Sequence, residues 1–299
     1  MPHSGNAPQS GSLIKSIVLA TDFLESSRLA LDYAVAFAHH YSAKLTIVHA
    51  VQLPPEAEEA EMLRRLPSIS REHATARLEA FASGVRRLGV DTAIDLRAGD
   101  PYAAVLGSTI ENKADLLVLG THGVYRGLEH MLIGSNAEKI LMSSPCPTLA
   151  VGRHVMAGID LKLNFRQILM VADMTQESVA AAQYADSLGK NLGVPAELIQ
   201  LLADDEAKDS DYERTAIEKY CASLRCLPGF SGHEWTEPAY HLKRISTPDE
   251  ITNRAIGCAD GLLILGVRKE PSWKRHLHAS FAFKLIAKSG CPVLSLHIA

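Results

Sequence analysis

The chain has 299 residues, of which 47% are hydrophobic and 6% aromatic, and its formal net charge at pH 7 is −4. The length predicts about two globular domains, while the slightly acidic balance and the lack of an apolar run near the roughly 20 residues of a membrane span disfavour nucleic-acid or membrane partners. Five cysteines without a paired framework indicate a reducing, cytoplasmic setting.

The N-terminal part of the chain predicts a tail, a strand and an amphipathic helix. Residues 1–12 are polar and are expected to be a disordered tail. Residues 16–20 form an apolar run that ends at Thr21 and Asp22, which predicts a buried strand with a carboxylate at its carboxyl end. The helix that follows, with Ser26 and Ser27 as candidate caps, carries an aromatic and aliphatic stripe at every fourth position. The stripe comprises Leu29, Tyr33, Phe37 and Tyr41.

The middle of the first half continues this alternation. Residues 44–51 predict a second strand, and residues 52–72 are expected to be an exposed, partly helical connection to a helix that ends near Leu88. Residues 91–96 predict a third strand. Asp100 and Pro101 then form a strong helix start, because Asp caps helices and Pro suits the first helical position. The expected apolar face of this helix comprises Val105, Leu106, Thr109 and Ile110.

A glycine-rich loop follows the fourth predicted strand. The apolar run 116–119 stops at Gly120, and Gly123 lies in the loop before Gly134 and Ser135 open another helix. Glycine lets a backbone approach a ligand closely, and the unpaired amides of a helix start attract anions. The spacing therefore predicts a phosphate-binding loop. Structural alternatives are that the glycines serve tight packing and that Ser135 forms a capping box with Glu138.

With residues 147–151 as a fifth strand, the order of elements is βαβαβαβαβ, which favours a parallel sheet with helices on both faces. Ligands of such sheets bind beyond the carboxyl ends of the strands, where the strand order reverses. If the first and fourth strands are neighbours, Asp22 and Gly120 face one crevice. Asp22 has the alternative role of capping the following loop.

The pattern restarts after a linker, expected at residues 153–164. Residues 167–172, 179–192 and 196–202 repeat the first strand, helix and second strand, and Asp173 repeats the carboxylate. Asp260 and Cys291 follow Asp115 and Cys146 at a common offset of 145. The chain therefore contains two copies of one fold, expected at residues 13–152 and 165–299.

The second copy has lost the predicted loop. Its counterpart of Gly120 is Gly266, but the second glycine is missing, and the offset of 145 places Ala279 and Ser280 over Gly134 and Ser135. A Cβ where a phosphate must approach the backbone is a steric obstacle. The loop is basic and aromatic instead, which indicates either a solvated segment or a site for an anion or an acidic partner.

These residues resemble the universal stress protein family, in a tandem form that covers both halves. The resemblance rests on Gly120-x2-Gly123 followed by Gly134-Ser135-Asn136, on the phrase S-P-C-P, and on Asp22 after the first strand. The family pattern has nine residues before the last glycine, whereas this chain has ten, the extra one falling at residues 124–126.

The resemblance implies two tandem flavodoxin-like αβα sandwiches of the adenine nucleotide alpha hydrolase type, each with a five-stranded parallel sheet. It implies ATP in the first copy only, with Mg²⁺ accompanying the ATP at most, and no other metal. The residues that would contact ATP are Ala20, Asp22, Val51, Gly120, His122, Gly123, Gly134, Ser135 and Asn136. The expected function is cytoplasmic stress-response regulation through nucleotide binding.

Two other functions stay open at this stage. One is a family member without nucleotide that acts through another ligand or a protein partner. The other is a weak ATPase or a protein that phosphorylates itself at Ser135, although the sequence contains no catalytic constellation and no lysine directly after the glycine loop. The last strands of the two copies, residues 148–151 and 293–296, are expected to pair within the chain, because pairing removes an open sheet edge. Association of two chains as a homodimer is a further possibility.

Overall fold

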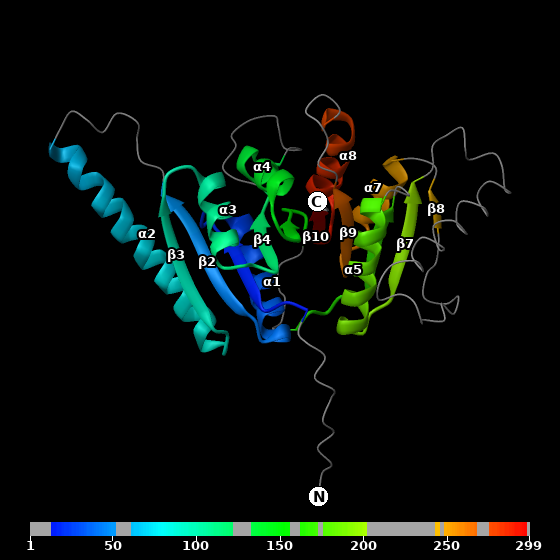
Figure 1. Ribbon diagram of the computed structural model, residues 1–299, viewed down its shortest axis with the longest axis horizontal. Coiled ribbons are helices and arrows are strands. Elements are labelled where there is room, and N and C mark those ends of the chain that lie inside the picture. The colour runs from blue at the N-terminus through cyan, green and yellow to red at the C-terminus, as the bar shows by residue number, and fades with distance from the viewer. Residues whose placement is uncertain are drawn as a thin grey trace, which may run out of the picture.

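A computed structural model of the chain describes residues 13–51, 61–121, 133–155, 162–172, 176–201, 243–245, 248–267 and 275–297. Ten strands form one sheet in the order β3-β2-β1-β4-β5-β10-β9-β6-β7-β8, with β3 and β8 at opposite ends (Figure 1). The first half contains β1 (Ser16–Ala20), α1 (Glu25–Tyr41), β2 (Lys44–Val51), α2 (Glu61–Arg87), β3 (Thr92–Ala98), α3 (Pro101–Glu111), β4 (Leu116–Gly120), α4 (Ser135–Ser143) and β5 (Thr148–Val151). The second contains β6 (Gln167–Ala172), α5 (Gln176–Leu192), β7 (Ala196–Leu201), β8 (Lys243–Ile245), α7 (Pro248–Ile256), β9 (Gly261–Val267), α8 (Arg275–Lys288) and β10 (Val293–His297).

Each half contributes five mutually parallel strands, and the two halves mirror each other about the centre of the sheet. In both halves the first strand lies between the second and the fourth, as the pairing of β1 with β2 and β4 and of β6 with β7 and β9 shows. The fold class predicted from the alternating elements is therefore confirmed. The placing of β1 beside β4 also brings the ends of these two strands to one crevice.

The two halves meet at their last strands. Strands β5 and β10 pair antiparallel, with Leu149 opposite Leu294, and the Ser295 hydroxyl donates a hydrogen bond to the Thr148 carbonyl at 3.2 Å. This is the pairing of last strands that the sequence predicts. Because each covers the other, neither last strand is left as an open edge at this junction.

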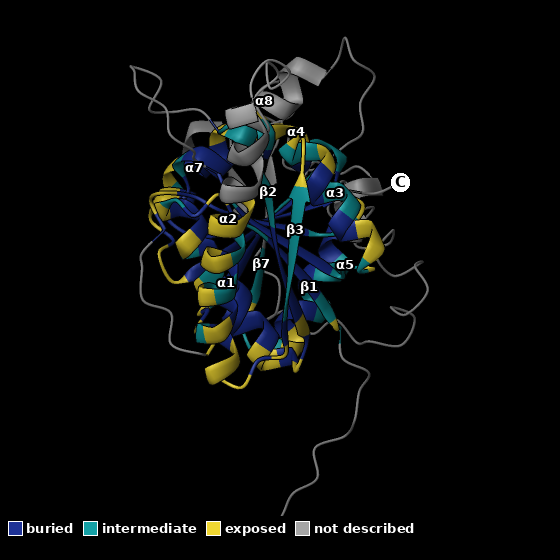
Figure 2. Ribbon diagram, turned by 90° about the vertical axis from the view of Figure 1, so that its left-hand side faces the viewer, coloured by how far each residue is buried: buried dark blue, intermediate teal, exposed yellow. Residues whose placement is uncertain are grey.

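Two hydrophobic layers sandwich the sheet, and each layer runs through both halves. Residues of α1, α2 and α5 pack on one face, and residues of α3, α4, α7 and α8 pack on the other. Figure 2 shows α1 and α2 with exposed residues turned outward and buried residues turned toward the sheet. The aromatic stripe of α1 behaves as predicted, since Tyr33, Phe37 and Tyr41 are all buried. Across the junction, Phe165 stacks on Tyr33 with 6.2 Å between the ring centroids.

Several boundaries and faces differ from the predictions. Helix α2 begins at Glu61 and includes the helical part of the connection expected at residues 52–72. Helix α1 begins at Glu25, so the expectation that Ser26 and Ser27 are caps is wrong; both are buried in the first turn. Ile110 is 62% exposed and does not belong to the buried face of α3, because this short helix turns only Ala104, Val105, Ser108 and Thr109 inward.

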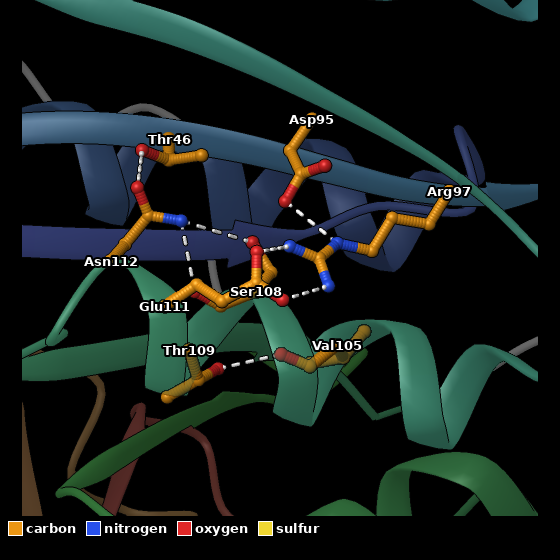
Figure 3. A network of polar contacts seen from close by, with 8 residues as sticks. All are labelled: Thr46, Asp95, Arg97, Val105, Ser108, Thr109, Glu111 and Asn112. Atoms are coloured by element: carbon orange, nitrogen blue, oxygen red, sulfur yellow. Dashed lines mark hydrogen bonds and ion pairs between the residues drawn. The ribbon is translucent and has the colours of Figure 1, made fainter.

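Polar contacts fix α3 against the sheet and thereby place its N-terminus (Figure 3). Arg97 on β3 donates to both carboxylate oxygens of Glu111 at 3.0 and 2.6 Å and to Asp95 at 2.8 Å. At the C-terminal end of α3, the Asn112 amide donates to the Ser108 carbonyl at 2.9 Å. At its start, Asp100 accepts a hydrogen bond from the Ala103 amide at 3.0 Å, which confirms the predicted cap.

The second half departs from the common offset of 145. Strand β6 pairs Ile168 with Leu262, as β1 pairs Ile17 with Leu116, so the offset at this strand is 146. The extra residue is Gly261, which separates Asp260 from Leu262, whereas Asp115 directly precedes Leu116. None of the helices in the described part of the chain is long and apolar enough to cross a membrane.

Candidate functional site

A cavity of about 230 Å³ lies beyond the carboxyl ends of β1, β2 and β4, at the point where the strand order reverses. Its lining divides into an apolar part from β2, β4, α3 and α4 and a polar part from the ends of β1 and β4 and the start of α4. The apolar lining comprises Val48, Ala50, Pro101, Val105, Leu119, Ala137 and Ile140. The polar lining comprises Thr21, Asp22, Ser27, His49, Gly120, Thr121, Gly134, Ser135 and Asn136, with Ala20 beside them. An apolar cavity with a few convergent polar groups is the usual form of a small-molecule site.

Asp22 occupies a tight turn between β1 and α1. The Thr21 hydroxyl accepts a hydrogen bond from the Phe23 amide at 3.0 Å, and the Asp22 carboxylate accepts one from the Leu24 amide at 2.9 Å. Asp22 therefore caps this turn, which is the alternative role that the sequence left open for it. A carboxylate has about four acceptor positions, so this single bond leaves most of them available to a ligand at the cavity.

Phe23 holds the turn in an unusual backbone conformation. Its φ of 65° lies in the left-handed region, which is costly for a bulky residue and persists only where the surroundings enforce it. The Phe23 ring is 5% exposed and packs 4.4 Å from the His49 ring and 5.4 Å from Phe81, with the Arg77 guanidinium 4.1 Å from its centroid. His49 also donates from Nδ1 to the Thr21 carbonyl at 2.7 Å. The turn that carries Asp22 is thus anchored from both sides.

Gly120 ends β4 against the start of α1. A Cβ on this residue would lie 2.6 Å from the carbonyl carbon of Ser26 and 2.7 Å from its hydroxyl oxygen. Close packing of strand on helix is therefore a sufficient reason for this glycine, in agreement with the structural alternative. Gly120 still lines the cavity, but its lack of a side chain is no argument for phosphate.

Helix α4 begins at the cavity with its backbone amides. Gly134 is its N-cap, with φ −59° and ψ 142°, and Ser135 is its first residue. The predicted capping box is therefore wrong, because Ser135 lies one position too late, and the Glu138 amide instead donates to the Gly134 carbonyl at 2.9 Å. The first amides of a helix lack intrahelical acceptors and carry partial positive charge, so this start is suited to an anion.

The cavity collects most, but not all, of the predicted site residues. Ala20, Asp22, Gly120, Gly134, Ser135 and Asn136 line it, whereas Val51 does not belong to the lining and Val48 and Ala50 of the same strand do. His122 and Gly123 lie outside the described residues, as does the extra loop residue. Lining residues that the sequence did not single out as site residues include Thr21, Pro101 and Thr121. The available signal was their position, because Thr21 and Thr121 directly follow β1 and β4 and Pro101 opens α3.

Comparison with known proteins shows the family to which the chain belongs. The model of the universal stress protein family matches residues 14–152. A universal stress protein of Thermus aquaticus is 35% identical over 146 residues, which cover 46% of this chain and 99% of that protein. The chain belongs to the universal stress protein family. A further universal stress protein, from Methanocaldococcus jannaschii, is 29% identical over 143 residues, or 46% of this chain and 82% of that protein.

The overall arrangement is also found in solved structures. A universal stress protein from Archaeoglobus fulgidus is 19% identical, with a TM-score of 0.70 over 96% of this chain and 97% of that chain. A putative universal stress protein from Pseudomonas aeruginosa gives a TM-score of 0.64 at 16% identity, over 95% and 93% of the two chains. At these identities the likeness concerns the fold, and it extends over nearly the whole of the present chain.

The second half of this universal stress protein does not reproduce the start of α4. Helix α8 begins at Arg275, so Ala279 and Ser280 lie inside a helix and not at its start, where the offset of 145 placed them. Helix amides inside a helix are bonded to the preceding turn and are not available to an anion. Residues 268–274 and Asp173 lie outside the described residues.

Proposed function

We propose that the first half of the chain binds one adenine nucleotide, ATP being the expected ligand, and that the protein acts as a cytoplasmic stress-response regulator. The observation that carries the proposal is the cavity at the strand-order reversal. It joins an apolar wall to a carboxylate and to the amino end of a helix, which are the three environments that a base, a ribose and a phosphate chain require.

The lining supports one orientation of the nucleotide. The base would lie against Val48, Pro101 and Val105, because a planar aromatic group gains most from apolar contact. Asp22 would accept hydrogen bonds from the ribose hydroxyls. The phosphates would meet the amides at the start of α4 and the Ser135 hydroxyl, in the way that helix starts hold anions elsewhere.

Magnesium would enter with the nucleotide. Asp22 is the only carboxylate among the described residues that line the cavity, and no cluster of three or more metal-ligating side chains occurs in the described part of the chain. Mg²⁺ commonly binds through one or two carboxylates together with substrate phosphates. This set of residues is consistent with an ion that enters together with ATP.

The proposed function is regulation by binding. A ligand at a thousandfold excess over its Kd stabilises the state that binds it by about 4 kcal/mol. That amount is enough to shift a conformational equilibrium by about a thousandfold. Among the described residues that line the cavity, His49 donates through Nδ1 to the Thr21 carbonyl and Asp22 caps its turn, and we propose no role in hydrolysis for either.

Isothermal titration of the full chain with ATP tests the proposal. We expect Gly134→Val to abolish binding, because the branched side chain stands where the phosphates approach the helix start. The φ of −59° and ψ of 142° at this position are accessible to valine, so the fold should persist.

Asp100→Ala is the matched control. It removes a helix cap of α3 at a cost of about 1 kcal/mol but leaves the polar lining of the cavity intact. The control should bind ATP like the unaltered chain. Equal affinity in Gly134→Val and the unaltered chain would refute the assignment.

A further inference from the structure

Two buried thiols of the second half lie next to each other at the amino ends of β9 and β10. Cys258 lies in the turn between α7 and β9 and is 4% exposed, and Cys291 directly precedes Pro292 and β10 and is 1% exposed. Both belong to the hydrophobic layer that contains α7 and α8. Because β10 runs antiparallel to β5, with Val293 opposite Ala150, this end lies at the same edge of the ten-stranded sheet as the carboxyl end of β5. Neither cysteine lines the nucleotide cavity, so the pair does not depend on the function proposed above.

Gly261 shows how closely the two thiols approach. A Cβ added to Gly261 would lie only 2.1 Å from the Cys258 sulfur, so this sulfur occupies space that a side chain at residue 261 would need. Strand β9 pairs Leu263 with Val293, and the same register two residues earlier places residue 261 beside Cys291. Neighbouring strands are about 4.8 Å apart. The Cys258 sulfur therefore lies close to the position of a cross-strand neighbour of Cys291, in the same hydrophobic layer.

The polar surroundings distinguish the two sulfurs. The Cys291 thiol donates a hydrogen bond to Cys258, which lowers the pKa of Cys258 and raises that of Cys291. The Gln167 amide donates to the Cys258 sulfur at 3.4 Å, and the guanidinium of Arg254 adds positive charge nearby. Cys291 contacts the Ser289 hydroxyl at 3.3 Å. Cys258 is thus the thiol whose anion is favoured, and the thiolate is the reactive form of cysteine.

The first half contains the counterpart of Cys291 but lacks the second thiol. Cys146 contacts the Ser144 hydroxyl at 3.9 Å, as Cys291 contacts Ser289, but the position of Cys258 is taken by Lys113. Lys113 and Cys258 correspond because each donates its amide to the carbonyl three residues earlier. Burial raises the pKa of Cys146 to about 11. Both the second thiol and the glycine that makes room for it are therefore features of the second half alone.

We propose that Cys258 and Cys291 are a site of reversible disulfide formation, with a peroxide as the oxidant. The Cys258 thiolate attacks one oxygen of hydrogen peroxide; a sulfur–oxygen bond forms, the oxygen–oxygen bond breaks, and hydroxide leaves. The Cys291 sulfur then attacks the Cys258 sulfenic acid, forming the disulfide as the sulfur–oxygen bond breaks. The departing hydroxide takes the Cys291 proton. In sum, two thiols and one peroxide give one disulfide and two waters.

The turn that holds Cys258 offers a route for a small oxidant. Gly257, Ala259 and Asp260 around it are all exposed, although the sulfur itself is covered. In a reducing compartment such a bond is transient and reports oxidant exposure, unlike the permanent bonds of secreted proteins. The disulfide would tie the beginning of β9 to the beginning of β10 and enclose α8 between its two ends.

Peptide mapping of the full chain after peroxide treatment tests the proposal. Trypsin, applied after the remaining thiols are blocked by alkylation, releases Cys258 in residues 255–268 and Cys291 in residues 289–299. We expect these two peptides to be joined, with the loss of two hydrogen atoms, and to separate again after dithiothreitol treatment. Residues 140–153, which carry Cys146, should remain alkylated and unlinked.

Three variants sharpen the result. Cys258→Ser should abolish the link between the two peptides, whereas Cys146→Ser, the matched control from the first half, should leave its yield unchanged. In Cys291→Ala, a sulfenic-acid reagent such as dimedone should label Cys258. The proposal is overturned if residues 255–268 and 289–299 remain unlinked in the unaltered chain at a peroxide dose that oxidises free glutathione completely. It is equally overturned if Cys146 enters disulfides at the same rate as Cys258.

Discussion

Substitution of Gly120 by alanine separates packing from ligand binding at the end of β4. The new Cβ would lie 2.6 Å from the Ser26 carbonyl carbon, whereas ordinary contacts of a Cβ begin near 3.4 Å. The start of α1 would therefore have to move by roughly 0.8 Å, the difference between these two distances. Because the obstructing atoms belong to the backbone, a change of side-chain rotamer cannot relieve the clash.

The expected cost is that of an overpacked core, about 1–3 kcal/mol of the free energy of unfolding. For a domain of this size, about 3 °C of the melting temperature corresponds to each kcal/mol. A shift of α1 also disturbs the 3.1 Å hydrogen bond between the Thr21 and Ser27 hydroxyls, next to Asp22. We therefore expect a lower melting temperature accompanied by weaker ATP binding.

Thermal unfolding followed by circular dichroism, together with ATP titration, measures both effects. Gly84→Ala in α2 is the control, since the nearest atom to its Cβ would be Arg87 Nη2 at 4.0 Å, and alanine there should stabilise the helix by up to about 1 kcal/mol. If Gly120→Ala loses ATP binding but melts like the unaltered chain, Gly120 is reserved for the ligand and the packing explanation is refuted.

Four further substitutions test individual contacts. Asp22→Asn keeps the acceptor for the Leu24 amide but removes the charge, so ATP affinity should fall about tenfold by titration while the melting temperature stays constant. Ser135→Ala should change the free energy of unfolding by less than about 0.5 kcal/mol in urea, because Ser135 is not the cap; a loss near 1 kcal/mol would restore the capping box. Asp100→Ala should cost about 1 kcal/mol in the same assay, and no loss would contradict the observed cap. Arg97 holds the pKa of Glu111 below its usual value, so this pair stabilises the fold above about pH 4.5 and the contribution is lost as the pH falls through the lowered pKa. In urea unfolding at a series of pH values, Glu111→Gln should therefore lose less unfolding free energy below about pH 4.5 than the unaltered chain. An equal loss in both proteins would exclude a contribution from this pair.

The sequence predicted the fold well because periodicity and turn chemistry act locally. The apolar run that became β1 has the predicted bounds, and Asp100 with Pro101 started α3 as expected. The chain duplication also predicted the pairing of β5 with β10, because both copies leave the same edge open. These features depend on short segments whose residues have strong preferences.

Features that depend on contacts between distant segments escaped prediction. Gly120 is explained by Ser26, which lies far away in the chain, and Phe23 takes a positive φ only because α2 and His49 hold its ring. The start of α4 was displaced by one residue, which a pattern of Ser and Glu cannot resolve. By contrast, the insertion of Gly261 is already implied by the match of Gly266 with Gly120, and the register of β9 confirms it. The cavity therefore lies at the strand ends where the sequence predicted a site, whereas the structure gives other reasons for several of its residues.

Mass spectrometry of the small molecules that the denatured protein releases tests the central claim most directly. The chain is purified without added nucleotide, denatured, and the extract is identified by mass and quantified by ultraviolet absorbance. Binding in the first half alone predicts one adenine nucleotide per chain, reduced to none in Gly134→Val. An extract without nucleotide, from protein whose melting temperature does not rise with added ATP, would contradict the claim.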